Sequence, residues 1–463
     1  MRYRFVDRSR ELSALERLWS EKGLRLVIVY GRRRVGKTWL LREFSRGKQA
    51  LFFVAVEASK SVLYRELCEL VEQLVGRPVG LIEDIDRVLK LVVDEVESPL
   101  IIIDEFQYLV KADPEAPSRI QRFVDENQGV DAMIVLCGSA VSFFERELLG
   151  YRAPLFGRRS ATLRLRPMDL LSAWGFYPRY GPLDAILSYA TFGGTPAYAS
   201  RVDDSRSVLE NVRREILDPS SYLFMEAVDF LRQELREPST YVAILSGIAM
   251  GYTKPSEIAS IAGVSQKTVS KYIDVLEALD IVERVRSMGR KRGEVQLSIA
   301  DPYFLFWFTF VKPYLSHLEA GFVDEVANVV EKRLDEYVPR VFESIVRREL
   351  APHIAKLLGV ELGEVGKWWY RGEEIDVVVR GATHALFAEV KWSDLDLREA
   401  KRVARDLEGK ASGSGLQKPS NTYAVIARRV ENCKPVCREG PYAYIDALNL
   451  LELLRASSSS SRK

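Results

Sequence analysis

Eight consecutive residues near the start of the chain have the types and spacing of a phosphate-binding loop. Gly31 and Gly36 enclose four residues and are followed by Lys37 and Thr38, as in the pattern G-x-x-x-x-G-K-[ST]. The N–H groups of such a loop surround phosphate oxygens at a helix N-terminus, the lysine reaches the β- and γ-phosphates, and the threonine hydroxyl can bind Mg²⁺. We expect nucleotide contacts along the whole loop: Gly31, Arg32, Arg33, Arg34, Val35, Gly36, Lys37 and Thr38.

A pair of acidic residues supplies the second half of a nucleotide site. Residues 100–104 form an apolar run that ends in Asp104, and Glu105 follows directly. Asp104 can hold Mg²⁺ through water, and Glu105 can polarise an attacking water molecule. Because both halves of the motif are present, we prefer a nucleotide site to a chance glycine turn.

Three further polar residues could lie beside the γ-phosphate. Ser139 follows the apolar run 133–137, so its hydroxyl is expected at the edge of the sheet, where it could sense or orient the phosphate. Without the phosphate-binding loop it would be an ordinary turn serine. Arg158 and Arg159 precede the last apolar run and could reach transition-state charge or a neighbouring subunit's nucleotide, although a solvated arginine pair fits equally well.

The elements that carry these residues alternate between strand and helix. Helical stretches, including residues 39–45, 62–74 and 85–96, separate most of the short apolar runs. This alternation predicts an α/β domain over residues 1–166, with a parallel sheet covered on both faces. Its strands are expected at residues 25–30, 51–56, 100–104, 133–137 and 162–166.

A helix-turn-helix pattern covers residues 256–273. Gly263 marks the turn and Ser265 is placed to cap the second helix. Two short strands, 281–286 and 294–299, follow and are joined by a basic turn, as in winged helices. Duplex DNA and a partner protein both remain possible ligands, since acidic residues share the second helix. The side chains expected to face DNA are Gln266, Lys267, Lys271, Arg290, Lys291 and Arg292.

Acidic residues also gather in the last third of the chain. Glu343 lies on an amphipathic helix, and alternation along two strands places Glu374 with Asp376, and Glu389 with Lys391, on single faces. A hairpin turn between the strands brings these faces together. A solvated hairpin is the alternative to a functional site.

Taken together, several motifs resemble the archaeal ATPase family of AAA-like and signal-transduction P-loop ATPases. The motifs are the phosphate-binding loop, the sequence DEFQ, the strand ending in serine, APLFGRRS, and the turn GGTP. The resemblance implies a helical lid in which Pro196 touches the base, whereas a tight loop between helices is the alternative. It also implies adenine contacts near Phe5, Arg8 and Glu11, although Asp7 replaces the usual glycine.

The acidic cluster in turn is similar to the restriction-endonuclease-like nuclease fold. That resemblance implies that Asp376 and Glu389 bind Mg²⁺, that Glu343 assists, and that Lys391 steadies the hydroxide or the phosphate. The proline that usually precedes the aspartate is absent, and Glu-Ile-Asp stands in its place.

The length and the composition of the chain are sufficient for several separate hydrophobic cores. The chain has 463 residues, a formal net charge of +2 and four cysteines, which excludes a small disulfide-stapled protein and confines any basic surface to a local patch. Cys433 and Cys437 could pair, but we favour two ordinary thiols. With no apolar run long enough to span a bilayer, we expect a cytoplasmic protein without a membrane partner.

The predicted architecture is α/β: a P-loop parallel-sheet ATPase domain with a helical lid, a winged helix and a C-terminal α/β nuclease-like domain. In chain order we expect the ATPase core at 1–166, the lid at 167–237, the winged helix at 238–300, connecting helices with a buried aromatic segment at 301–335, the nuclease-like domain at 336–455 and a disordered tail at 456–463.

From these residues we predict an ATP- and Mg²⁺-dependent ATPase whose nucleotide state controls DNA binding and the nuclease-like domain. A monomer and a homo-oligomer are both compatible with these residues. The alternative is a nucleotide-dependent regulator of DNA or protein with an inactive nuclease-like domain.

Overall fold

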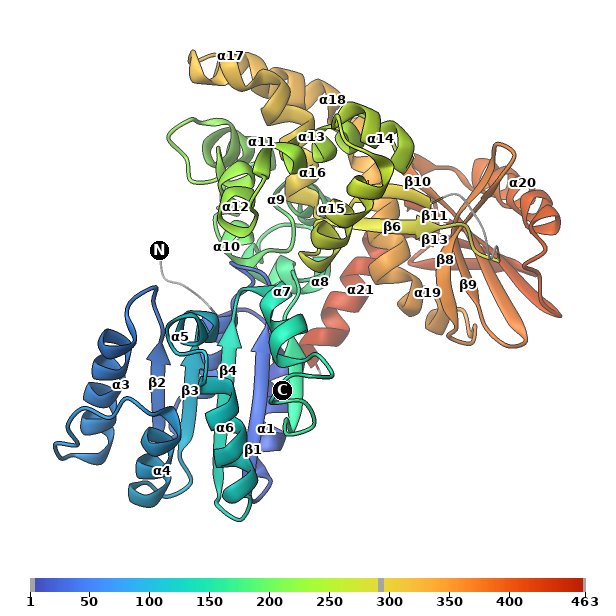
Figure 1. Ribbon diagram of the computed structural model, residues 1–463. Helices are drawn as coiled ribbons and strands as arrows, with labels where there is room; N and C mark the ends of the chain where they lie inside the picture. The colour runs from blue at the N-terminus through green and yellow to red at the C-terminus, as the bar shows by residue number, and fades with distance from the viewer. Residues whose placement is uncertain (1–4, 290–294, 461–463) are drawn as a thin grey trace. The chain divides into compact units, whose positions relative to one another are not determined.

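The computed structural model describes residues 5–289 and 295–460, which form two compact units, Met1–Pro167 and Met168–Lys463 (Figure 1). The division falls one residue after the expected end of the ATPase core. Apart from Pro167, the first residue of the predicted lid, the segments predicted as lid, winged helix, connecting helices and nuclease-like domain lie in the second unit.

The first unit is built on a five-stranded sheet in the order β2-β3-β4-β1-β5, with all neighbouring strands parallel. β3 and β4 are buried along their whole length, as expected for parallel strands covered on both faces. The predicted α/β fold is thereby confirmed. The strands are β1 Leu24–Tyr30, β2 Ala50–Val54, β3 Leu100–Asp104, β4 Ala132–Gly138 and β5 Ala161–Arg164.

The helices of the first unit each present an apolar face to the sheet. Leu40 and Leu41 of α2, for example, pack with Val27 and Val29 of β1 in one buried cluster. The helices are α1 Ser9–Ser20, α2 Lys37–Phe44, α3 Lys60–Val75, α4 Ile85–Glu95, α5 Phe106–Ala112, α6 Ala116–Glu126, α7 Val141–Phe143 and η1 Phe144–Leu148.

The second unit begins with short helices. A turn between two of them contains Gly194, where a Cβ atom would lie 1.7 Å from the carbonyl oxygen of Met168. Close packing therefore explains this glycine. The helices are α8 Leu170–Ala173, η2 Trp174–Phe176, α9 Pro182–Phe192, α10 Pro196–Ala199, α11 Val208–Val212, η3 Arg213–Leu217, α12 Glu226–Glu234 and α13 Pro238–Ala249.

The predicted helix-turn-helix and hairpin follow. They are α14 Pro255–Ile261, α15 Gln266–Ala278, β6 Val282–Arg286 and β7 Val295–Ile299. The Ser265 hydroxyl accepts a hydrogen bond from the N–H of Thr268 at 3.2 Å, which caps α15 as expected. Val269, Ile273 and Leu276 form the buried face of α15. The three basic residues expected in the turn, 290–292, lie outside the described residues.

An aromatic segment forms a core of the second unit, as predicted. Tyr303, Phe304 and Trp307 are buried, and the Trp307 Nε1 donates to the carbonyl oxygen of Phe224 at 2.6 Å. α18 extends across the expected boundary at 335/336. The elements are α16 Pro302–Phe306, η4 Trp307–Val311, η5 Lys312–Tyr314, α17 Leu315–Glu319, α18 Val323–Ile345, η6 Val346–Leu350 and α19 Ala351–Leu357. Across the described residues, every helix is too short or too polar to cross a membrane.

A six-stranded mixed sheet completes the second unit, in the order β12-β13-β11-β10-β9-β8. β9 and β10 form the predicted antiparallel hairpin, whereas β10, β11 and β13 run parallel. The elements are β8 Glu364–Tyr370, β9 Glu373–Arg380, β10 His384–Leu395, α20 Leu397–Ser414, β11 Ser420–Val430, β12 Val436–Glu439, β13 Tyr442–Asp446 and α21 Ala447–Ser460.

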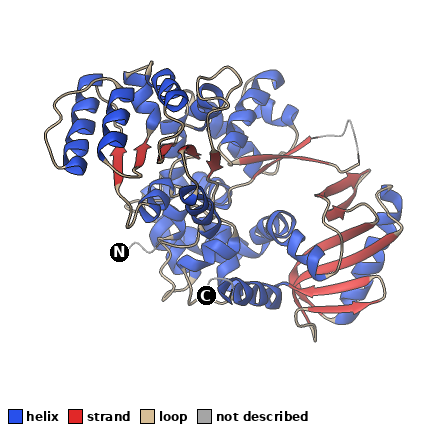
Figure 2. Cartoon of the chain, turned by 90° about the horizontal axis from the view of Figure 1, so that it is seen from below, coloured by secondary structure: helices blue, strands red, loops and turns tan. Residues whose placement is uncertain are grey.

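The β6–β7 hairpin is a separate two-stranded sheet (Figure 2), and Ser287, directly after β6, forms an isolated bridge with Lys367 of β8. The N–H of Met288 donates to the carbonyl oxygen of Lys367 at 2.9 Å, and the Ser287 hydroxyl both donates to and accepts from the backbone of Trp369 at 3.0 Å. The Met288 side chain is buried in the same cluster as Trp368 and Leu416. The root of the wing is thus part of the core of the C-terminal sheet.

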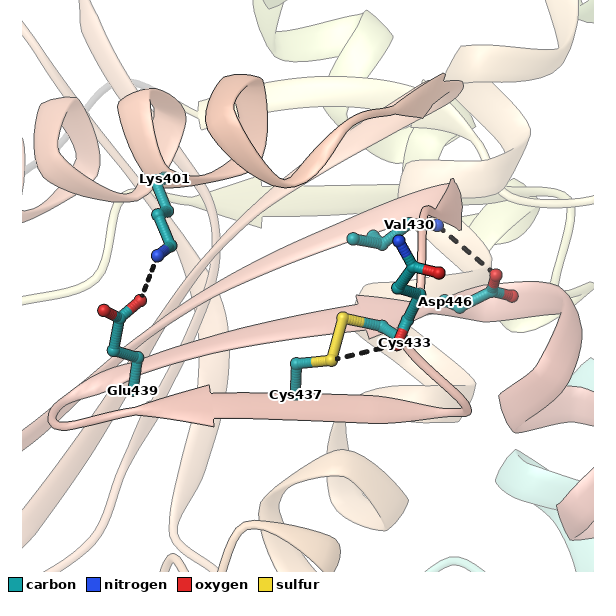
Figure 3. Close-up of a disulfide and its surroundings, with 7 residues drawn as sticks. Lys401, Val430, Cys433, Cys437, Glu439 and Asp446 are labelled. Atoms are coloured by element: carbon teal, nitrogen blue, oxygen red, sulfur yellow. Dashed lines mark hydrogen bonds and ion pairs between the residues drawn. A yellow bond between two sulfur atoms is a disulfide. The ribbon is translucent and has the colours of Figure 1, made fainter.

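Two expectations about the end of the chain are corrected. Cys433 and Cys437 form a disulfide rather than two free thiols, because the loop between β11 and β12 folds back and brings their Cα atoms to 5.3 Å (Figure 3). In the same region Lys401 of α20 and Glu439 of β12 form an ion pair at 2.6 Å. Residues 456–460, expected to be disordered, continue helix α21.

A carboxyl group of η6 connects this helix to the first helices of the second unit. Glu349 accepts hydrogen bonds from the N–H of Leu170 at 2.7 Å and from the Tyr189 hydroxyl at 2.8 Å. Burial, together with the nearby charge of Asp169, raises the pKa of Glu349 to about 7.

We therefore expect Glu349→Gln to raise the free energy of unfolding relative to the parent, and to raise it more at pH 8 than at pH 5. Because the folded-state pKa is above the usual value, the protonated carboxyl stabilises the fold at low pH, and this contribution, roughly 3 kcal/mol, is lost as pH rises through about 7. The glutamine keeps a similar shape without titrating. Thermal unfolding at both pH values, with the exposed Glu331→Gln as control, measures the effect. An unchanged pH profile in Glu349→Gln would contradict it.

Candidate functional site

The sheet order brings the predicted nucleotide residues to one edge. β4 lies between β3 and β1, and all three strands are parallel, so their carboxyl ends meet. Gly31 follows β1, Asp104 ends β3 and Ser139 follows β4. This is the edge at which open α/β sheets bind their ligands.

The phosphate-binding loop connects β1 directly to α2. A Cβ atom on Gly31 would lie 2.1 Å from the carbonyl oxygen of Leu165, and Gly36 has a φ of 90°, so both positions require glycine. Lys37 is buried, and its Nζ donates to the carbonyl oxygens of Gly31 at 2.7 Å and Arg32 at 2.9 Å. The loop thus curls around the lysine at the start of a helix.

The two expected magnesium ligands are in direct contact. The Thr38 hydroxyl donates to an Asp104 carboxylate oxygen at 2.6 Å, and Asp104 is buried. An oxygen pair of this kind suits a hard divalent cation that keeps most of its waters.

Glu105 lies at the same edge and is held by two neighbours. Its Oε2 accepts hydrogen bonds from the Ser139 N–H at 3.2 Å, from the Ser139 hydroxyl at 2.7 Å and from Gln107 Nε2. The backbone of Glu105 has a φ of 52°, an uncommon conformation that places this carboxylate beside β4. Gln107 was not among the predicted site residues, although it is the last letter of DEFQ.

The arginine pair is engaged within the first unit. Arg158 contacts the Asp125 carboxylate at 3.1 and 3.3 Å, and the Arg159 guanidinium lies over the Phe156 ring at 5.6 Å. A role for either arginine at transition-state phosphate stays a prediction. Pro196 is the first residue of α10 in the second unit, and its contact with the base also stays a prediction.

A second group of carboxylates lies in the C-terminal sheet. Glu343 of α18 and Glu374 and Asp376 of β9 each offer one oxygen, and these oxygens lie within 4.8 Å of one another. Such a group can hold a metal ion. The Lys367 Nζ, which sequence reasoning missed, donates to Glu343 at 2.6 Å and also pairs with Glu374.

Glu389, which was expected to share a metal with Asp376, forms ion pairs with Lys391 at 2.9 Å and with Lys410 of α20 at 3.1 Å. The third carboxylate of the group described above is Glu374, and a shared metal between Glu389 and Asp376 stays a prediction. Lys410 comes from a helix that lies beyond the motif in the sequence. Burial, followed by repulsion from Glu343 and Glu389, raises the pKa of Asp376 to about 7.

Comparison with known proteins places the chain in a family. It is 30% identical over 438 residues to the uncharacterized protein MJECL04 of Methanocaldococcus jannaschii, covering 92% of this chain and 96% of that protein. Residues 5–202 match the family described as an ATPase domain predominantly from Archaea. The chain belongs to the archaeal ATPase family. This archaeal ATPase is accordingly an ATP-binding P-loop protein, as the motifs predicted.

Other similarities of the archaeal ATPase cover less of the chain. Residues 307–403 match a family of archaeal and bacterial proteins of unknown function. The uncharacterized ATP-binding protein MJ0423 of Methanocaldococcus jannaschii is 53% identical over 45 residues, 10% of this chain and 76% of that protein.

Among solved structures, the Walker-type ATPase paby2304 of Pyrococcus abyssi is 20% identical to the archaeal ATPase. The match has a TM-score of 0.47 and covers 66% of this chain and 96% of that one. The ORC2 protein of Aeropyrum pernix is 15% identical, with a TM-score of 0.43 and coverage of 72% and 98%.

Proposed function

We propose that this ATPase couples ATP binding and hydrolysis to DNA contact by its winged helix and to the C-terminal acidic cluster. In the nucleotide site, Lys37 binds the β- and γ-phosphates, Thr38 and Asp104 hold Mg²⁺, Glu105 polarises the attacking water, and Ser139 orients Glu105. The hydrogen bonds that join Thr38 to Asp104 and Ser139 to Glu105 support these roles.

The observation that carries the proposal is the attachment of the wing to the acidic cluster. Met288, at the root of the wing, bonds to the backbone of Lys367, whose side chain pairs with Glu343. A displacement of the winged helix can therefore reach the cluster through Lys367. This link supports a joint task for the two modules.

DNA is the proposed ligand of the winged helix because the charge that opposed it is partly neutralised. Asp274 and Glu277 share α15 with the exposed basic side chains, but both carboxylates pair with Arg284. Lys267 and Lys271 lie on the same helix and are exposed. They can contact phosphates.

We expect Lys267→Glu combined with Lys271→Glu to weaken duplex DNA binding and to flatten its salt dependence by about two units of log–log slope, because two phosphate contacts are lost. Binding titrations at several salt concentrations measure both quantities. Lys332→Glu with Lys356→Glu, an equal charge change on exposed lysines of other helices, serves as control. Equal weakening by the two pairs would favour a partner protein for α15.

For the acidic cluster we propose Mg²⁺-dependent phosphodiester cleavage. Glu343, Glu374 and Asp376 are the proposed ligands, and Lys391 stabilises charge on the phosphate. The metal pair of Asp376 and Glu389 that the nuclease resemblance implies stays a prediction. Within 4.8 Å of one another, the three carboxylate oxygens match the preference of a hard cation for oxygen ligands.

A regulator with a silent C-terminal domain is the second candidate, and a specific observation favours it. Lys367 pairs with two carboxylates of the cluster, and Lys391 and Lys410 both pair with Glu389. These lysines already neutralise much of the charge that would attract a metal ion.

Incubation of the full chain with ATP, Mg²⁺ and duplex or single-stranded DNA, scored for phosphate release and for strand breaks, tests the proposal. ATP hydrolysis with DNA cleavage supports it in full. Hydrolysis with nucleotide-dependent DNA binding but no breaks supports the regulator, and hydrolysis that neither alters nor responds to DNA binding contradicts both.

A further inference from the structure

Arg8 stands immediately before α1 in an unusual backbone conformation. Its φ is 63°, which non-glycine residues seldom adopt, and its side chain is only 9% exposed. A buried, strained residue persists where its surroundings hold it, and such residues gather at functional sites.

The Arg8 guanidinium joins three segments of the first unit. One Nη2 atom donates to the carbonyl oxygen of Val35 at 3.0 Å and to that of Arg166 at 2.7 Å, while Nη1 donates to Glu11 at 2.8 Å. Val35 belongs to the phosphate-binding loop, and Arg166 follows β5 close to the end of the first unit.

The bond to Val35 bears directly on the shape of the loop. The carbonyl of Val35 and the N–H of Gly36 belong to one planar trans peptide, so they point in opposite directions. Fixing the carbonyl toward Arg8 therefore fixes the Gly36 N–H away from it. In a phosphate-binding loop these N–H groups form the cradle for the phosphates.

We propose that Arg8 is a positioning residue for ATP: it sets the peptide between Val35 and Gly36 and anchors it to the segment after β5. Arg8 acts through the loop backbone, so it affects interactions made equally in the ground state and the transition state. Its loss accordingly raises KM more than it lowers kcat.

The test compares full-length variants well below their unfolding temperatures. Arg8→Met removes all three hydrogen bonds, and Arg8→Lys keeps one charged donor group. Arg10→Met, which changes an exposed residue of α1, is the control. We expect the KM for ATP to rise about tenfold in Arg8→Met with a change in kcat below about threefold, an intermediate KM in Arg8→Lys, and a change below about twofold in Arg10→Met.

A purely structural role has a different signature. It lowers the unfolding temperature of Arg8→Met equally with and without ATP and leaves KM unchanged, and that result would overturn the proposal. A smaller ATP-induced rise in unfolding temperature, accompanied by the higher KM, supports it. If Arg8→Met does not fold, the same two measurements on Arg8→Lys decide: a KM within about twofold of the parent rejects the positioning role.

Discussion

Replacement of Lys37 by alanine is expected to abolish ATP binding, whereas Glu105→Gln keeps binding and stops turnover. Lys37 is enclosed by the phosphate-binding loop and supplies a charge for the phosphates, so its loss removes affinity. Glu105 follows β3 at the same edge of the sheet, and its carboxylate is the proposed water-polarising group, a role that the amide cannot fill. We expect its removal to lower kcat by roughly a hundredfold or more.

Binding of a fluorescent ATP analogue and steady-state phosphate release separate the two effects. Lys22→Ala and Glu126→Gln, which change exposed residues of the same unit, provide matched controls. Hydrolysis by Glu105→Gln at the rate of the parent would remove Glu105 from the proposed role.

The second large effect is expected at the C-terminal cluster, where Asp376→Asn should eliminate Mg²⁺-dependent DNA cleavage and leave ATP hydrolysis intact. Asp376 lies within reach of Glu343 and Glu374, and its loss removes one of three charged ligands. The nucleotide site has its own pair of proposed magnesium ligands, Thr38 and Asp104, which are hydrogen-bonded to each other. Strand-break and phosphate-release assays on one preparation measure both activities, with the exposed Asp406→Asn as control.

The stability of the same variant distinguishes a metal site from a silent cluster. Burial and two neighbouring carboxylates raise the pKa of Asp376 to about 7, above its usual value, so the protonated form stabilises the fold and this contribution is lost as pH rises through about 7. Without metal, Asp376→Asn should therefore be more stable than the parent at pH 8. Mg²⁺ should reverse that order if the parent binds it.

The regulator would be favoured by two results together. The parent would show no DNA cleavage under any nucleotide or metal condition, and the gain in stability of Asp376→Asn would be the same with and without Mg²⁺.

Local patterns predicted those parts of the fold and the site that depend on neighbouring residues. The phosphate-binding loop could be predicted because its glycines and its lysine act through a short stretch of backbone. Parallel strands then bring Asp104 and Ser139 to the loop by a general rule of sheet topology. The period-two alternation of side chains along two strands predicted that Glu374 and Asp376 share one face, and the β9–β10 hairpin has the predicted antiparallel pairing.

The features that were missed depend on residues distant in the sequence. Arg8 bonds to Arg166 across a separation of 158 residues. Lys410 of α20 donates to Glu389, and the amphipathic pattern of α20 does not predict which polar side chains the helix contacts. Such contacts are set by how whole elements pack, and a single sequence carries no direct record of that packing.

The attachment of Ser287 and Met288 to β8 also covers part of an open sheet edge. β8 is the last strand of its sheet, and a bare outer strand offers unpaired N–H and carbonyl groups to any other extended chain. Ser287 and Met288 cover part of this rim, and Met288 fills space in the core beneath it. Cutting the chain after residue 300 would expose this edge of the sheet and also leave a cavity in the core where Met288 packs. The isolated C-terminal fragment should therefore aggregate under conditions in which the whole chain does not.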